Sequence, residues 1–140
     1  MTKLVSALKR PAELYLVIVG GGYAFASLVA FIANAHEVFA SSGRIGISDF
    51  REDLGENTIM FAVSAATLIA GVGIHKYRRW ALALAAVLGV LMILEAAREW
   101  EMDPWDFHNF TIAVPMAAIM IWALLPPTWT VFTQRNLKAS

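Results

Sequence analysis

The chain contains no cysteine among its 140 residues. This excludes disulfide bonds, thiolate metal sites, CxxC redox motifs and a cysteine nucleophile, because each of these needs a thiol. Charged residues are also few, at 16% of the chain, and 11 basic side chains balance 11 acidic ones. Nucleic-acid-binding domains normally carry a positive excess, so we expect no nucleic-acid partner.

Sequence motifs of catalysis are lacking as well. The chain has no GxSxG, HExxH or CxxCH motif, and its one glycine triplet, Gly20–Gly22, lies inside an apolar run rather than between a strand and a helix. The long apolar runs also lack the acids or histidines near their centres that ion and proton pathways need. These absences argue against an enzyme and against a proton-coupled carrier.

Apolar residues are abundant instead, at 59% of the chain, with a mean hydropathy of +0.60. Soluble domains contain roughly 45–50% apolar residues. Four apolar runs, at about 14–39, 57–75, 80–97 and 104–125, are each near the length that crosses a hydrocarbon core of roughly 30 Å. Unpaired backbone is too costly in lipid, so all four are expected to be helices. We predict an all-α integral membrane protein with one transmembrane domain, 1–140, folded as an antiparallel four-helix bundle with a polar tail at 126–140.

The charges are divided between the two ends of this predicted bundle. One end combines the N-terminus, the 76–79 turn and the C-terminal tail, and only Glu13 opposes its basic residues there: Lys3, Lys9, Arg10, Lys76, Arg78, Arg79, Arg135 and Lys138. The other end has three basic residues (Arg44, Arg51, Arg98) and the remaining ten acids. The positive-inside rule places both termini in the cytoplasm, which suits a bacterial cytoplasmic (inner) membrane.

The 40–56 segment is the longest predicted loop. Asp49 has the position of a helix N-cap, Glu52 follows three residues later and Gly55 can close the helix. We expect a short interfacial helix on the outer leaflet, with a plain loop as the alternative.

Small residues recur every four positions on all four runs, which allows helices to approach closely in lipid. They are Gly22, Ala26 and Ala30, then Ala62, Ala66 and Ala70, then Ala81, Ala85 and Gly89, and finally Ala113 and Ala117.

The stretch EAAREWEMDPWDFHNF, residues 95–110, gathers acids and tryptophans between two apolar runs. Asp103 followed by Pro104 is a typical helix start, so the stretch is interpreted mainly as a solvated junction between two helices. Its outward side chains would meet a basic partner, either soluble or extrinsic. The partner-facing residues we predict are Glu99, Trp100, Glu101, Asp103 and Trp105.

Two histidines suggest an alternative. His36 ends the first run and His108 starts the fourth, so both are expected at the outer interface. Two imidazoles on facing helices can ligate a haem iron axially, and imidazoles together with carboxylates can instead form a mixed nitrogen–oxygen metal site. The carboxylates in question are Glu37, Glu95, Asp106 and Glu99. No cofactor is otherwise expected.

The leading functional hypothesis is a small non-catalytic accessory or scaffolding subunit of a larger membrane complex, plausibly respiratory or photosynthetic, with lipid and other membrane subunits as its partners. The first alternative is a haem- or metal-binding redox protein that uses His36 and His108. The second is a small oligomeric transporter or channel with Pro115 and Gly20–Gly22 as moving parts.

In outline the chain resembles the DoxX-like family of small bacterial membrane proteins, in size, in its inside termini and in the basic turn KYRR at 76–79. It departs from that family because the first run has no Gly-x-x-Lys motif. The anchor subunits of respiratory complexes are similar in size, but their haem-ligand histidines lie on other helices. No residue role is therefore carried over from either.

Overall fold

Five helices make up almost all of the described chain in a computed structural model. The structure describes residues 1–40, 47–102 and 108–139, with side chains at 1–37, 55–102 and 111–138. The helices are α1 (Thr2–Ala40), α2 (Ile47–His75), α3 (Arg79–Met102), α4 (His108–Leu124) and α5 (Pro126–Ala139). Three of them are long and apolar enough to cross a membrane, or four if α4 and α5 count as one bent span. The predicted all-α membrane protein is confirmed at this level.

Several helix ends differ from the prediction. Helix α1 begins at Thr2 rather than near residue 14, and α2 begins at Ile47. Residues 47–56, expected as a separate interfacial helix or a loop, are thus the first part of α2, and Gly55 lies within that helix. At 1.5 Å per residue, the 39 residues of α1 extend about 58 Å, well beyond a hydrocarbon core of roughly 30 Å. Hydropathy located the lipid-compatible part of each helix but not where the helix ends.

The C-terminal tail is also helical. Helix α5 bends by 66° from α4 at Leu125, directly before Pro126 and Pro127. Proline cannot donate the backbone hydrogen bond of a helix interior but suits a first turn, so the two prolines end α4 and start α5. The prolines at Pro11 and Pro115, by contrast, lie inside α1 and α4.

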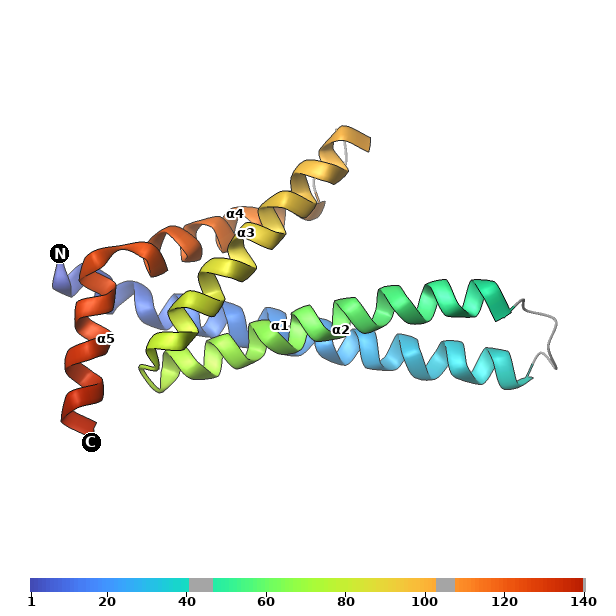
Figure 1. Ribbon diagram of the computed structural model, residues 1–140, viewed down its shortest axis with the longest axis horizontal. Helices are drawn as coiled ribbons and strands as arrows, with labels where there is room; N and C mark the ends of the chain where they lie inside the picture. The colour runs from blue at the N-terminus through green and yellow to red at the C-terminus, as the bar shows by residue number, and fades with distance from the viewer. Residues whose placement is uncertain (41–46, 103–107, 140) are drawn as a thin grey trace.

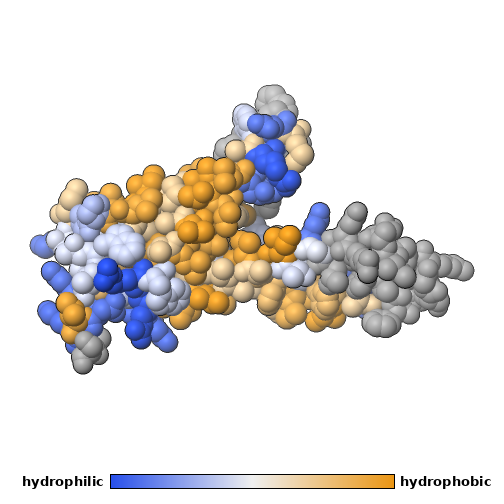
Figure 2. Space-filling model, viewed as in Figure 1, coloured by the Kyte–Doolittle hydropathy of each residue, from blue (hydrophilic) through white to orange (hydrophobic). Residues whose placement is uncertain are grey.

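Figure 1 shows two helical hairpins, α1–α2 and α3–α4, that meet at one end of the molecule and diverge toward the other. The N-terminus, the turn between α2 and α3, and α5 all gather at the shared end. Figure 2 shows an apolar surface along the middle of the molecule, with hydrophilic residues at the shared end and at the tip of the α3–α4 hairpin. The predicted four-helix bundle is not confirmed, because the hairpins separate along their length.

Glycine allows the closest contacts between helices. A Cβ at Gly20 would lie 2.5 Å from the backbone nitrogen of Leu68, and a Cβ at Gly71 would lie 2.8 Å from Cγ2 of Val17. A Cβ at Gly89 would lie 2.6 Å from Cβ of Met120. Gly20 and Gly71 therefore set the spacing of α1 and α2, and Gly89 that of α3 and α4, as expected where dispersion holds helices together.

Candidate functional site

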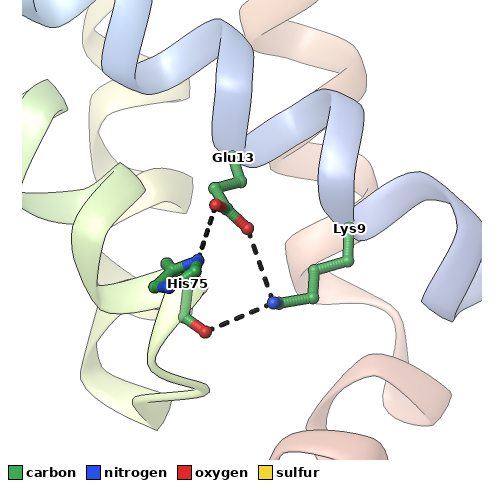
Figure 3. A network of polar contacts seen from close by, with 3 residues as sticks. All are labelled: Lys9, Glu13 and His75. Atoms are coloured by element: carbon green, nitrogen blue, oxygen red, sulfur yellow. Dashed lines mark hydrogen bonds and ion pairs between the residues drawn. The ribbon is translucent and has the colours of Figure 1, made fainter.

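A polar network joins α1 to the end of α2 at the shared end of the molecule. Figure 3 shows its three residues, Lys9, Glu13 and His75. Glu13 contacts Lys9 Nζ at 3.4 Å and His75 Nδ1 at 2.7 Å, while Lys9 Nζ donates to the backbone carbonyl of His75 at 3.3 Å. Lys9 thus satisfies a carbonyl at the C-terminus of α2, where positive charge is also favoured by the helix dipole.

Tyr77 follows this network in the turn between α2 and α3. The Arg78 N–H donates to the Gly73 carbonyl at 2.8 Å and the Tyr77 N–H to that of Ile74 at 3.0 Å, the two bonds of a Schellman motif. That motif needs a left-handed residue, and Tyr77 has a φ of 55°. Glycine usually fills such a position, so the tyrosine ring must provide an interaction that glycine could not.

The Tyr77 ring is a contact point for α1, the turn and α5. Lys9 Nζ lies 3.9 Å from its centroid, and Arg135 of α5 lies 5.3 Å from it. The ring of Phe132, also on α5, packs against it with centroids 5.3 Å apart. Cation–π and tilted aromatic contacts each contribute about 0.5–1 kcal/mol, which offsets the cost of the left-handed backbone.

Helix α5 is fastened by buried groups as well. Phe132 is 1% exposed and packs edge-on against Trp122 of α4. Trp122 donates its indole N–H to the carbonyl of Val5 at 3.3 Å, and Thr128 donates its hydroxyl to the carbonyl of Trp122 at 2.8 Å. The Thr128 bond crosses the α4–α5 bend and holds α5 to α4, while the Trp122 bond holds α4 to α1. Both bonds satisfy buried polar groups at the shared end.

The polar network gives a stability prediction with a matched comparison. Glu13 has a side chain only 17% exposed and pairs with two cationic or polar groups, whereas Glu95 pairs with Arg98 at 51% exposure. We expect Glu13→Gln to lower the unfolding free energy by about 1–2 kcal/mol, because it leaves Lys9 without its charge partner. Glu95→Gln should have a smaller effect, because the charges of an exposed pair are screened by solvent.

Unfolding in mixed detergent micelles measures both values. Equal effects of the two variants would show that the contacts of the partly buried Glu13 stabilise the protein no more than the exposed pair of Glu95 and Arg98.

The described residues of the predicted site lie toward the far ends of the hairpins. His36 and Glu37 are exposed near the C-terminal end of α1, and Glu95 is exposed on α3, where it bonds Arg98. Figure 1 shows the end of α1 and the start of α4 at the tips of different hairpins. His108 is the first residue of α4, but its side chain is outside the described residues, as are the side chains of Asp103, Trp105 and Asp106.

The haem and metal hypothesis therefore stays a prediction. Among the residues whose side chains the structure describes, no three histidine, aspartate or glutamate side chains group as a metal site would need. The described members of the predicted partner-facing surface lie on the last turns of α3: Glu101 is exposed, Trp100 is 45% exposed and Glu99 is half-buried. Their relation to a partner is likewise still a prediction.

A shallow groove lies between α1 and α2, on the side toward their outer tips. The groove has a volume of about 170 Å³. Its lining combines apolar and polar side chains, namely Ser27, Leu28, Phe31, Asn57, Thr58 and Phe61. The Ser27 hydroxyl is buried without a hydrogen-bond partner among the described residues, whereas Ser64 and Thr67 of α2 bond the carbonyls four residues earlier. Serine in a membrane helix normally finds such a bond or a partner across a helix interface.

The four predicted small-residue stripes do not all serve the same purpose. Ala81, Ala85 and Gly89 are buried, and they pack α3 inside the protein. On α1, Gly22 and Ala26 are exposed and Ala30 is half-buried. A Cβ added at Gly22 would meet no atom within 4 Å among the described residues. The stripe on α1 thus remains open to a neighbour outside this chain.

Sequence reasoning missed the residues that organise the shared end. From the sequence, Tyr77 is placed only in the 76–79 turn and Phe132 only in the polar tail at 126–140. One signal was present: Thr128 and Phe132 are four apart and Arg135 three further on, which is helical spacing with a distinct face. The contact of Glu13 with His75, 62 residues away, left no local signal.

Comparison with known proteins finds no matching family model, no matching curated protein and no matching solved structure.

Proposed function

We propose that this chain is a small non-catalytic scaffolding subunit that spans a bacterial cytoplasmic membrane four times and packs against another membrane subunit of a larger complex. The observation that carries the proposal is the open stripe of Gly22, Ala26 and Ala30 on α1. In lipid, apolar surface alone gives no reason for helices to associate, and small residues that allow close backbone contact do. The stripe on α3 is wholly buried and the stripes on α2 and α4 are partly buried, so the stripe on α1 is the most open to a partner helix.

The proposed topology has both termini in the cytoplasm, with the four apolar helices alternating in direction. The arrangement of charge supports it: the start of α1, the α2–α3 turn and α5 gather at one end, and eight basic side chains accompany them against Glu13 alone. On this topology the acidic hairpin tips face the exterior, where Glu99, Trp100 and Glu101 suit a basic extrinsic protein.

The partner helix can be tested by filling the stripe. Gly22→Leu places a large side chain where the protein itself has no neighbour within 4 Å among its described residues, so we expect the variant to fold normally. The same side chain would keep a partner helix at a distance. In mild detergent, the wild-type chain at native expression should migrate in a particle well above its own 15.4 kDa, and Gly22→Leu should release it as the free chain.

The absence of cysteine makes a second measurement simple. Ala26→Cys, oxidised in native membranes, forms a disulfide only with a facing thiol, either on a second copy of the variant or on a partner that carries a cysteine at that point. A disulfide to another protein would support the proposal, whereas a self-crosslinked dimer would show that the neighbour is a second copy of this chain. A wild-type chain that migrates alone would overturn the scaffolding function itself.

A further inference from the structure

The shared end of the molecule forms a basic surface that the scaffolding role does not require. We call it the basic end and define it by eight residues from three segments: Lys3, Lys9, Arg10, Lys76, Arg78, Arg79, Arg135 and Lys138. All are exposed except Lys9, which is half-buried. The one acid in these segments, Glu13, is already engaged by Lys9 and His75. The positive charge of the other residues is therefore not neutralised within the described chain.

Two of these exposed cations are held in place by aromatic rings. Arg135 lies over Tyr77 at 5.3 Å, and Arg79 lies over Trp129 at 5.8 Å from the ring centroid. A ring fixes the position of a guanidinium but leaves its net charge and most of its N–H groups available. Guanidinium groups ordered in this way suit phosphate, to which arginine donates two parallel hydrogen bonds.

Helix α5 brings its cations to the same level as those of the turn. It turns away from α4 by 66° and lies across the end of the molecule (Figure 1). Its 14 residues extend about 21 Å and include Arg135 and Lys138, so it is too short and too polar to cross the bilayer itself. Trp80, 51% exposed at the start of α3, marks the level at which membrane tryptophans usually meet lipid headgroups.

We propose that the basic end binds the phosphate headgroups of anionic phospholipids in the leaflet that surrounds it, with α5 lying along the headgroup layer. Figure 2 shows this end as a concentration of hydrophilic residues directly beside the apolar surface, which is where headgroups meet a membrane protein. A basic residue near an anionic leaflet gains from the surface potential, and a zwitterionic leaflet offers no such gain. The interaction depends on charge, so it weakens as salt rises.

The test compares three forms of the full chain in nanodiscs. The neutralised form carries Lys76→Gln, Arg78→Gln and Lys138→Gln, three exposed sites with no acidic partner among the described residues. The charge-preserving form carries Lys76→Arg, Arg78→Lys and Lys138→Arg. Native mass spectrometry then counts the phosphatidylglycerol molecules that each form retains from discs of mixed phosphatidylglycerol and phosphatidylcholine.

We expect the wild type and the charge-preserving form to retain phosphatidylglycerol in preference to phosphatidylcholine. The neutralised form should lose about fivefold in this preference for each charge removed, and high salt should reduce the preference of the wild type. Arg98→Gln, at the opposite end of α3, should leave it unchanged.

Equal retention by the neutralised form and the wild type would overturn the proposal. It would also be overturned if the wild type showed no preference for phosphatidylglycerol while an acidic peptide such as polyglutamate bound it and not the neutralised form. The basic end would then be a docking surface for a soluble acidic protein. Neither result affects the scaffolding function, which is tested at Gly22, further along α1 than Lys3, Lys9 and Arg10.

Discussion

Gly20→Ala is expected to destabilise the protein by about 1–3 kcal/mol or more. The new methyl carbon would lie 2.5 Å from the Leu68 nitrogen, 2.9 Å from the Ser64 carbonyl oxygen and 3.0 Å from the Leu68 Cα. All three are backbone atoms of α2, so no side-chain rotation relieves the overlap. Helices α1 and α2 must therefore move apart or shift. This movement weakens the other close-packed contacts along the α1–α2 hairpin, which lowers the free energy of unfolding.

Gly22→Ala is the matched control, two residues away on the same helix. Its methyl group meets nothing within 4 Å among the described residues, so the helix keeps its packing. Alanine also has less backbone entropy than glycine in the unfolded chain, so less entropy is lost on folding. We expect a change between zero and a gain of about 1 kcal/mol. Equilibrium unfolding of both variants in mixed micelles should therefore give opposite signs. A Gly20→Ala protein as stable as the wild type would show that α1 and α2 are not in such close contact.

Phe132→Ala is expected to release α5 from the shared end. The ring is almost wholly buried and makes the aromatic contacts to both Tyr77 and Trp122. Truncation of a buried phenylalanine costs about 3–5 kcal/mol. The Thr128 bond and the cation–π pairs that remain on α5 each contribute only about 1 kcal/mol, so we expect this 14-residue helix to detach. Amide hydrogen exchange over residues 126–139 should rise, while exchange in the α1–α2 hairpin should stay close to the wild-type rate.

Leu137→Ala is the control for Phe132→Ala. It tests whether truncation of any apolar side chain on α5 raises amide exchange over residues 126–139. Leu137 lies on the same helix and is 73% exposed, so its truncation should change exchange very little. Unchanged protection of residues 126–139 in Phe132→Ala would mean that Phe132 does not hold α5. A rise in exchange over the whole chain would mean instead that α5 and the hairpins unfold together.

The apolar runs predicted membrane-crossing helices because composition determines whether a helix can lie in lipid. Composition says much less about where a helix ends. The first turns of α1 carry Lys3, Lys9 and Arg10, which are compatible with a helix but not with lipid, so the predicted start near residue 14 marked a boundary of hydropathy and not of hydrogen bonding. Hydropathy also did not indicate helix α5. The sequence predicts residues 126–140 only as a polar tail, because their mean hydropathy is typical of a surface segment.

The small-residue stripes were visible in the sequence, but spacing of four positions cannot show which stripe faces inward. That depends on the tertiary arrangement, in which Gly89 meets Met120 and Gly22 meets nothing among the described residues. The predicted pairing of His36 with His108 depends on the same kind of information, and it stays a prediction because the side chain of His108 is not described. Glu13 and His75 show the converse case, a contact between distant segments that no local pattern announced.

The left-handed backbone of Tyr77 makes the final geometry of the α2–α3 turn depend on α5. A non-glycine residue in that conformation costs of order 1–3 kcal/mol, and part of what offsets the cost comes from α5, through Phe132 and Arg135. Because α5 comes after the turn in the chain, the ribosome delivers it after the turn. The α2–α3 hairpin is therefore expected to reach its final geometry only when α5 has been synthesised. Helix α5 thus stabilises the geometry of a turn that was synthesised about 50 residues earlier in the chain.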